Sequence, residues 1–458
     1  MVEKIERQRP KERDRYERRT NFEPVEENLT PQQATLEASR CLNCKNPRCV
    51  SGCPVNINIP NFIEAIKNDK LDEAGKIIRN TSFLPSVCGR VCPQERQCEG
   101  KCVLGIKGEP IAIGALERYV GDNTDAVAEV APSTGKKVAI IGSGCAGITA
   151  AADLRKEGHE VVVFEALHKL GGVLRYGIPP FRLPRKFLDR EINSLKELGV
   201  KFITNVVAGK SVTIKQLKED GFDAVFICSG AGLPKMLGIK GENLNGVYSA
   251  NEFLTRVNLM NANSPDTPTP LKTGKRAIVV GGGNVAMDAA RVAVRTGFES
   301  VKIVYRRTEA ELPARLEEIR HAKEEGVVFQ FLHNPVEVMG EDGFVKSAKL
   351  EIMELGEPDE SGRRSPVPTG TYVTEDVDTF IVALGTGPNP IIQSSVAEDG
   401  LSLDTDRKGY IIIDAETGKT SIEGVYAGGD VAPVGTSNAI NAMGAGKRAA
   451  KAINEYLK

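Results

Sequence analysis

Several features are scarce in this sequence, and each absence narrows the range of functions. The 458-residue chain contains no tryptophan, and aromatic residues make up only 5% of it. Its four histidines, at positions 159, 168, 321 and 333, form no grouping that indicates acid–base catalysis. No run of apolar residues approaches the roughly 18 needed for a transmembrane helix. The formal net charge of −1 argues against a general nucleic-acid-binding protein, which would be strongly basic.

The beginning of the chain also lacks the apolar region of a secretory signal peptide. Residues 1–20 are densely charged instead. We therefore expect a cytoplasmic protein with no membrane and no nucleic-acid partner. The mixed charges of residues 1 to about 30 favour a solvated arm or helix, with a subunit-contact arm as the alternative.

Cysteine is the residue with the most uneven distribution, because eight of the ten lie between positions 41 and 102. In a long chain expected to be cytoplasmic, such a cluster indicates metal binding rather than disulfides. Zinc ribbons usually carry two Cys-x2-Cys pairs, whereas one is present here, and a cysteine followed by proline is typical of iron–sulfur proteins. We therefore favour iron–sulfur clusters over zinc. The two groups are Cys41-x2-Cys44-x4-Cys49-x3-Cys53-Pro54 and Cys88-x3-Cys92-x5-Cys98-x3-Cys102.

The first glycine-rich turn follows a short apolar strand, residues 138–141, and opens a helix. Gly142 permits a tight turn, Gly144 lets the backbone approach a pyrophosphate, and Gly147 allows helix and strand to pack closely. The next strand ends at Glu165, whose carboxylate can accept hydrogen bonds from a ribose hydroxyl. Because a helix N-terminus also favours phosphate charge, this order of elements predicts a dinucleotide site.

Two further motifs select FAD as the dinucleotide at this first turn. Leu170-Gly171-Gly172 follows Glu165 closely, as in flavoproteins with two dinucleotide-binding domains. Residues 424–430 resemble the second FAD motif of that superfamily, in which Gly429 and Asp430 would contact the ribityl chain or the phosphates. The helix expected over residues 438–457 would point its N-terminus at the flavin, where a positive dipole stabilises the reduced anionic form.

The second glycine-rich turn follows the strand expected over residues 276–280. Gly281, Gly283 and Ala286 occupy the three small positions, and Asn284 begins the helix. The next strand ends in Arg306 and Arg307, where an acidic residue would favour NAD. Two guanidinium groups can instead bind a ribose 2′-phosphate through charge-assisted hydrogen bonds. We therefore predict NADP(H), with NAD(H) as the alternative.

The segment from residue 378 to Gly387 resembles the return of the chain into the FAD domain, with Gly385 and Gly387 near both nucleotides. The NADP(H) domain is thus expected as an insertion in the FAD domain. The fold class expected is α/β, with an N-terminal helical iron–sulfur domain followed by two Rossmann-like domains. The expected ranges are 1–125 for the cluster domain, 131–250 with 386–458 for the FAD domain, and 251–385 for the NADP(H) domain.

The cysteine region supports a specific resemblance that extends over essentially the whole chain. Cys41-Leu-Asn-Cys44, Gly52-Cys53-Pro54-Val55, Cys92-Pro93-Gln94-Glu95 and Cys98-Glu-Gly-Lys-Cys102 resemble the N-terminal domain of the glutamate synthase small (β) subunit family. The pattern is also similar to the large subunit of NADH-dependent reduced ferredoxin:NADP oxidoreductase and to the N-terminal part of dihydropyrimidine dehydrogenase. The resemblance further implies a glutathione-reductase-like flavoprotein fold.

The resemblance also implies two [4Fe–4S] clusters whose ligands are shared crosswise between the two cysteine groups. Cys41, Cys44, Cys49 and Cys102 would hold one cluster, and Cys53, Cys92 and Cys98 would hold the other. Glu117 is the candidate for the remaining ligand, and Cys88 is its rival.

The function implied is an FAD-dependent NADPH oxidoreductase that moves electrons between NADPH, FAD and the two clusters. No protein residue is expected to act as a catalytic acid or base, because the flavin carries the chemistry. The first interpretation is the NADPH-oxidising subunit of glutamate synthase, whose partner is a large synthase subunit. The alternative is the large subunit of the bifurcating ferredoxin:NADP oxidoreductase, whose partner is a smaller flavin and iron–sulfur subunit.

Overall fold

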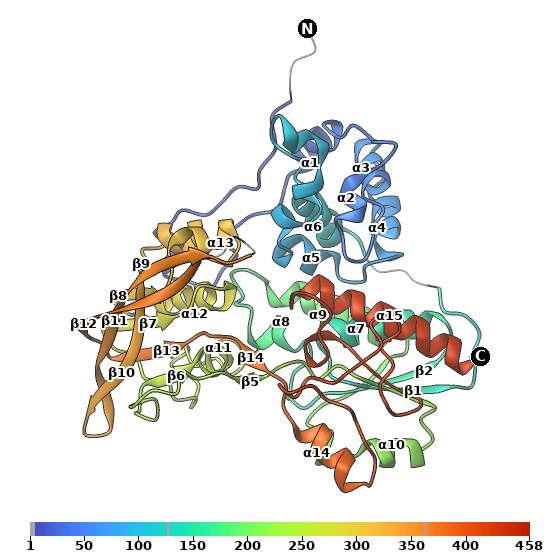
Figure 1. The fold of residues 1–458 in the computed structure, drawn as a ribbon. Helices are drawn as coiled ribbons and strands as arrows, with labels where there is room; N and C mark the ends of the chain where they lie inside the picture. Colours follow the sequence, from blue (N-terminus) through green and yellow to red (C-terminus); the bar gives the residue numbers. More distant parts are fainter. Residues whose placement is uncertain (1–4, 126–128, 361, 363) are drawn as a thin grey trace.

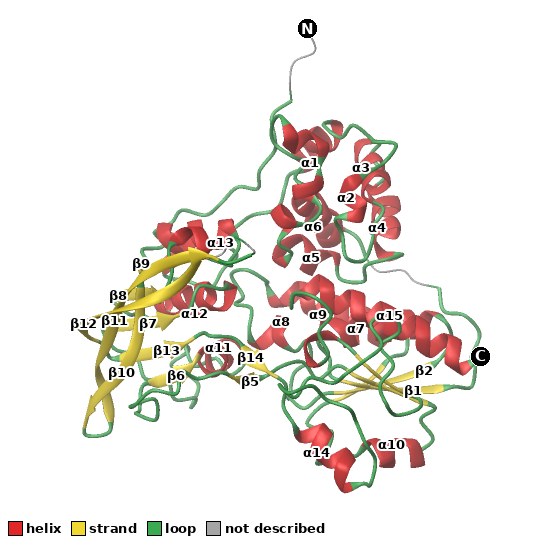
Figure 2. Ribbon diagram, in the orientation of Figure 1, coloured by secondary structure: helices red, strands yellow, loops and turns green. Residues whose placement is uncertain are grey.

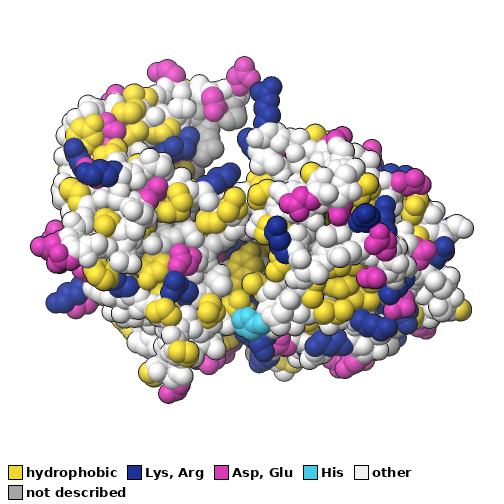
Figure 3. Space-filling model, turned by 90° about the horizontal axis from the view of Figure 1, so that it is seen from below, with side chains coloured by type: hydrophobic (Ala, Val, Ile, Leu, Met, Phe, Trp, Pro, Cys, Tyr) yellow, Lys and Arg dark blue, Asp and Glu magenta, His cyan; other side chains and the backbone are white. Residues whose placement is uncertain are grey.

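The computed structural model describes residues 5–125, 129–360, 362 and 364–458, and shows three lobes. Figure 1 shows a helical lobe built from the first part of the chain, lying above two lobes that each contain a parallel sheet. Helices and strands are segregated accordingly, because the N-terminal lobe is drawn without a strand (Figure 2). A hollow separates two halves of the molecule on the face seen from below (Figure 3).

The N-terminal lobe packs short helices around a shared apolar core. The first helix begins at Pro31, because Thr30 and Gln33 form a reciprocal capping box and proline suits the first helical position. Helices α3 and α4 are separated at residues 68–70, where Asp69 has a φ of 57°. The helices are α1 (Pro31–Ser39), α2 (Arg48–Ser51), α3 (Ile59–Lys67), α4 (Leu71–Arg79), α5 (Pro85–Val91) and α6 (Ile113–Asn123).

The first sheet has the strand order β15-β4-β1-β2-β3, and all of its pairs are parallel. Helices cover both faces, with α7, α9 and α15 on the face toward the N-terminal lobe and α10 and α14 on the other (Figure 1). The strands are β1 (Lys137–Ile141), β2 (Glu160–Phe164), β3 (Lys201–Ile203), β4 (Ala224–Ile227) and β15 (Val425–Ala427). The helices are α7 (Cys145–Lys156), α8 (Val173–Tyr176), α9 (Arg185–Glu197), α10 (Ile214–Glu219), α14 (Ile391–Glu398) and α15 (Ala439–Leu457).

The second sheet has the strand order β6-β13-β7-β8-β9, again entirely parallel. Helices α11 (Ala250–Asn258), α12 (Asn284–Arg295) and α13 (Leu316–Glu324) share an apolar core with one face. The strands are β6 (Val247–Ser249), β7 (Arg276–Val280), β8 (Ser300–Tyr305), β9 (Val328–Phe331) and β13 (Thr379–Val382).

The other face of the second sheet is covered by strands rather than by helices. Three antiparallel strands, β10 (His333–Glu341), β11 (Phe344–Pro358) and β12 (Arg364–Asp376), pack residues such as Val338 and Leu350 against it. A short ribbon of β5 (Leu233–Pro234) and β14 (Thr386–Gly387) connects the two lobes. Because β15 pairs with β4, the part of the sequence that forms the second lobe is inserted between two adjacent strands of the first sheet.

The N-terminal arm does not extend into solvent as the charge pattern suggested. Arg18 is 1% exposed and forms ion pairs with Glu324 and Glu325 of the second lobe. Val25 is also buried, and its backbone N–H donates to the Phe181 carbonyl at 3.0 Å. The expectation of a solvated arm is therefore wrong for this part of the chain, because its arginines have buried carboxylate partners contributed by a distant segment.

Candidate cluster and nucleotide sites

Four half-buried cysteines of the N-terminal lobe line one cavity, which we call the outer group. Cys41 and Cys44 follow α1, Cys49 lies in α2, and Cys102 follows a short 3₁₀ helix over residues 99–101. Burial raises the pKa of the Cys49 thiol to about 11, and the Cys102 and Cys41 thiols add to this effect. Thiolates this close together need a bound cation to be stable. Apolar side chains complete the wall, among them Leu42, Ile59, Ile63, Leu104 and Ile111.

A second set, the inner group, consists of Cys53, Cys92, Cys98 and Glu117. All four side chains are buried, and they come from the end of α2, the end of α5, the start of the 99–101 helix and the middle of α6. Burial raises the pKa of Cys53 to about 11, and the Glu117 carboxylate contributes further. Burial likewise raises the pKa of Cys98, with Glu99 and Glu117 as charged neighbours. The charged neighbours of Cys53 and Cys98 thus include Glu117, and the assignment of these residues as cluster ligands stays a prediction.

Glu117 is the member of the inner group with an unmet binding requirement. Burial raises the pKa of its carboxyl to about 8, and its Oε1 is buried with no hydrogen-bond partner among the described residues. A buried carboxylate oxygen without a partner costs free energy. An iron ion at this point would supply the missing interaction, so the donor set of three thiols and one carboxylate fits an iron–sulfur cluster.

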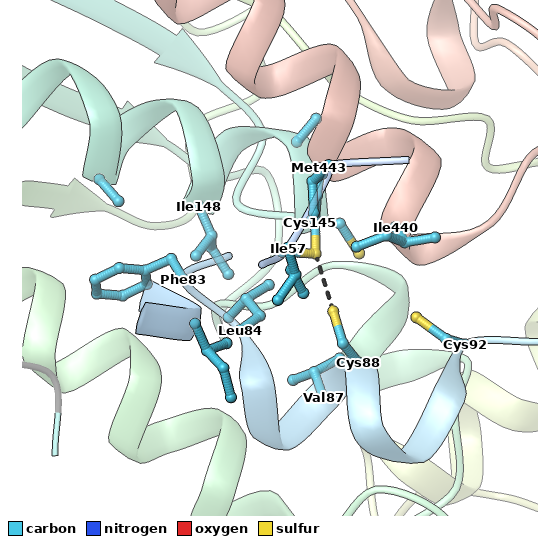
Figure 4. Packing of buried hydrophobic residues seen from close by; sticks show 14 of the residues in the cluster. Ile57, Phe83, Leu84, Val87, Cys88, Cys92, Cys145, Ile148, Ile440 and Met443 are labelled. Atoms are coloured by element: carbon cyan, nitrogen blue, oxygen red, sulfur yellow. Dashed lines mark hydrogen bonds between the residues drawn. The ribbon is translucent and has the colours of Figure 1, made fainter. Parts of the chain in front are cut away.

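Cys88, the rival ligand, has its thiol engaged elsewhere. Its Sγ lies 3.4 Å from the Met443 thioether of α15 and 3.8 Å from the Ser82 hydroxyl. Figure 4 shows the Cys88 sulfur directed at Met443, with Cys92 one helical turn away. A hydrogen bond with Cys88, followed by burial, raises the pKa of the Cys92 thiol. Cys88 therefore borders the inner group and also contacts the helix α15.

The first glycine-rich turn connects β1 to α7 in the geometry of a dinucleotide site. Gly142 has a φ of 113°, which side-chain-bearing residues rarely adopt. A Cβ on Gly144 would meet no atom within 4 Å, whereas one on Gly147 would overlap the Gly142 carbonyl. Gly144 thus leaves open space for a ligand, while Gly147 permits close packing. Glu165, at the end of β2, accepts hydrogen bonds from the Ser143 N–H at 3.0 Å and the Ser143 hydroxyl at 2.5 Å.

The remaining predicted FAD residues surround the same turn. A Cβ on Gly172 would come within 3.0 Å of the Gly144 Cα, so these two segments lie against each other. Gly429 begins a 3₁₀ turn, residues 429–431, that immediately follows β15. Burial raises the pKa of Asp430, while a hydrogen bond with Ser437 opposes the rise. These groups and the N-terminus of α15 leave a site suited to an anionic dinucleotide.

The second glycine-rich turn repeats this geometry between β7 and α12. Gly281 has a φ of 140°, and a Cβ on it would overlap the Ala383 carbonyl of the neighbouring strand. A Cβ on Gly283 would again meet nothing within 4 Å. Asn284 starts α12 and accepts a hydrogen bond from the Arg315 N–H at 2.9 Å, and Ala286 is fully buried. The turn therefore presents open backbone at the N-terminus of a helix.

The two arginines that follow β8 differ in their surroundings. Arg306 is exposed, whereas the Arg307 guanidinium donates to the Arg364 carbonyl of β12 at 2.9 Å. The antiparallel sheet thus fixes one of the two guanidinium groups. Gly385 and Gly387 lie in the connection between the lobes, where a Cβ on either would meet no atom within 4 Å. The predicted site residues therefore gather around the two turns and the inter-lobe ribbon.

Sequence reasoning missed two residues that organise these sites. Ser143 lies within the first turn, is fully buried and positions Glu165. Arg315 donates to the Arg90 carbonyl at 2.9 Å and to the Gln94 side chain at 2.8 Å, joining the second lobe to the cluster lobe. Nothing in the sequence around Arg315 indicated this role, because Arg90 and Gln94 lie more than 200 positions away.

Two family models match successive parts of the chain. Residues 18–128 match the family model described as dihydropyrimidine dehydrogenase domain II, 4Fe-4S cluster. Residues 136–446 match the model of the pyridine nucleotide-disulphide oxidoreductases. No helix within the described parts of the chain has both the length and the apolar character required to cross a membrane.

Individual relatives align with the chain along most of its length. It is 37% identical to the glutamate synthase [NADPH] small chain of Halomonas elongata, over 99% of this chain and 97% of that one. It is 39% identical to the NADP(+)-dependent formate dehydrogenase subunit beta of Moorella thermoacetica over 90% of this chain, but spans only 60% of that subunit. FprA of Mycobacterium tuberculosis, solved with NADPH, shares the fold with a TM-score of 0.56 at 23% identity, covering 71% of this chain and 84% of FprA.

Proposed function

Because the chain belongs to the glutamate synthase small-chain family of pyridine nucleotide-disulphide oxidoreductases, we propose that it is the NADPH-oxidising subunit of a glutamate synthase. In this role it transfers electrons from NADPH, through FAD and two [4Fe–4S] clusters, to a larger partner subunit. Its relatives carry the names of small or beta subunits, which supports a partner for this chain as well.

The observation that carries the proposal is the position of the inner group between the first glycine-rich turn and the outer group. Cys88, one turn of α5 before Cys92, contacts Met443 of α15, and α15 packs on the helix that follows the turn. The inner group is buried, whereas the outer group is half-buried. This order supports electron transfer from a buried flavin toward the surface of the N-terminal lobe.

Each cofactor has a set of residues that would hold it. FAD would lie on Gly142, Gly144, Glu165 and Asp430, where it would supply two-electron exchange with the nicotinamide and one-electron exchange with the clusters. Backbone N–H groups of the first glycine-rich turn and the start of α15 would orient it. NADP(H) would lie on the second turn with its 2′-phosphate at Arg306 and Arg307. The clusters would be held by the inner and outer groups defined above, with Glu117 as the carboxylate ligand.

The experiment that tests the function is anaerobic affinity purification of the full chain from its native host, with the co-purifying subunit identified by mass. We expect a partner much larger than this chain, and a complex that forms glutamate from glutamine and 2-oxoglutarate with NADPH. A smaller flavin and iron–sulfur partner, with NADH-dependent exchange between ferredoxin and NADP, would replace this proposal with the bifurcating oxidoreductase.

A further inference from the structure

The gap between the inner group and the first glycine-rich turn is closed by two sulfur atoms. Cys88 at the middle of α5 and Met443 in the first turns of α15 are 1% and 0% exposed, and the Cys88 thiol donates to the Met443 Sδ at 3.4 Å. This distance corresponds to direct contact, so no void separates α5 from α15 at this point. Figure 4 shows the contact at the centre of a shell of apolar side chains.

Each of the two sulfurs also lies next to one of the cofactor sites. On one side, Cys88 lies one turn of α5 before Cys92, a candidate ligand of the inner cluster whose backbone N–H donates to the Cys88 carbonyl at 3.2 Å. On the other side, the Cys145 thiol at the start of α7 lies near both Cys88 and Asp430 of the proposed FAD site. Figure 4 places Cys145 beside Met443. The contact therefore spans the space between the two sites.

We propose that the Cys88–Met443 contact is the route by which electrons pass between the flavin and the inner cluster, and that Cys88 is not an iron ligand. The inference rests on the proposed function, since it needs both cofactors in the chain. Each electron that crosses oxidises the reduced flavin by one equivalent and reduces the inner cluster by one equivalent. Neither sulfur changes its oxidation state, and the proton released by the flavin goes to solvent.

The physical reason is continuity of packing. Electron tunnelling through protein weakens steeply wherever the path crosses empty space, so two large, polarizable sulfur atoms in contact provide a favourable path. Truncating Met443 removes atoms from the middle of that path, and packed cores refill such voids only in part. Leucine has a similar volume and should restore most of the contact.

The test uses purified full-length protein in which the flavin is reduced by a photochemical donor rather than by NADPH. We expect Met443→Ala to slow the following reduction of the cluster by about tenfold, because the void interrupts the path, while Met443→Leu stays close to the wild-type rate. Ile453→Ala is the matched control, because it empties a fully buried site farther along α15. It should lose stability without slowing the electron step.

Two readouts besides rate separate the possible outcomes. Iron and FAD contents of Met443→Ala and Cys88→Ser should equal those of the wild type, and so should the electron paramagnetic resonance spectrum of the chemically reduced clusters. A wild-type rate in Met443→Ala, or loss of iron in Cys88→Ser, would overturn the inference alone. Wild-type protein that binds neither flavin nor iron would overturn the proposed function and this inference with it.

Discussion

At the scale of single residues, the surroundings of Glu117 and Cys88 indicate which of the two is the remaining ligand of the inner cluster. The sequence pattern left that choice open. Because Glu117 Oε1 is buried without a hydrogen-bond partner in the described parts of the chain and the Cys88 thiol is engaged with Met443, we expect Glu117→Ala to lose about half of the bound iron, the share of one of two clusters. Cys88→Ser should keep all of it. Iron per chain, measured on anaerobically purified protein, checks both variants. Full iron in Glu117→Ala with half in Cys88→Ser would reverse the assignment.

The proposed recognition of the nucleotide 2′-phosphate also depends on individual side chains. Replacing Arg306 and Arg307 together by alanine should raise the KM for NADPH by at least about tenfold, because even one charged hydrogen bond contributes roughly 1.5–3 kcal/mol. The KM for NADH should change little, since NADH has no phosphate at that position. Steady-state kinetics with an artificial acceptor measure both constants.

The control for this pair is Lys346→Ala, which removes an exposed cation from β11 of the same lobe. Arg306 is exposed and Arg307 is fixed by the Arg364 carbonyl, so the single variants should differ from each other. Equal increases of the KM for NADPH and NADH in the double variant would contradict the assignment of these arginines.

The sequence was sufficient for residues whose role is set by neighbours close along the chain. Gly142 and Gly144 could be interpreted because a turn between a strand and a helix makes local demands that only glycine meets. Ser143 and Arg315 could not, since their importance appears only when Glu165 and Gln94 are brought next to them. The separation of the cysteines into two sets came from a family resemblance, because spacing alone does not determine which cysteines converge.

At the scale of secondary-structure elements, the packing of α15 against α7 determines whether the flavin site can form. A Cβ on Gly446 would overlap the Ala146 carbonyl of α7, so Gly446→Ala should destabilise the protein by roughly 1–3 kcal/mol through overpacking. Gly444 in the same helix has space for a Cβ, with its nearest atoms at 3.5 Å. Gly444→Ala should therefore be neutral or stabilising by about 0.5–1 kcal/mol.

Chemical denaturation of the two variants, followed by FAD content, measures this difference. We expect Gly446→Ala to bind less FAD, because the start of α15 shifts away from the turn that follows β1. A Gly446→Ala protein as stable as Gly444→Ala would contradict this prediction. It would mean that α7 and α15 can move apart at no cost in stability.

Helices and strands were predicted well where the local sequence pattern determines them. They were missed where contacts with neighbouring elements determine the structure. The helix expected over residues 438–457, for example, is observed as α15. The antiparallel sheet of β10, β11 and β12 was not anticipated, because β12 is largely exposed and lacks an apolar alternation. Its position over the second sheet depends on the neighbouring strands β10 and β11 that it pairs with.

At the scale of the whole molecule, a network of buried ion pairs joins the lobes. Arg182, which lies between α8 and α9, forms ion pairs at 2.7 Å with both Asp288 and Glu318 of the second lobe. Arg18 of the N-terminal arm reaches Glu325 in the same network at 3.2 Å. The arm is thus attached by charge pairs that are removed from water, and breaking one partner of such a pair is costly.

A carboxyl of this arm makes its attachment depend on pH. Burial and the nearby Glu317 carboxylate raise the pKa of Glu26 to about 8 from an ordinary 4.5, against the opposing effect of Arg118 and with Glu12 also near. The folded chain therefore binds the Glu26 proton more tightly than the unfolded chain. This contribution to stability is fully present below pH 4.5 and is lost as the pH rises through about 8.

We therefore expect the melting temperature of the wild-type protein to fall between about pH 5 and about pH 8, and Glu26→Gln to remove most of that fall, because glutamine stays uncharged. Hydrogen exchange of residues 10–27 should accelerate over the same range in the wild type and not in the variant. Glu27→Gln, at the exposed neighbouring position, is the control and should behave as the wild type. An equal fall of the melting temperature over this pH range in wild type and Glu26→Gln would show that the arm is held by the arginine network alone.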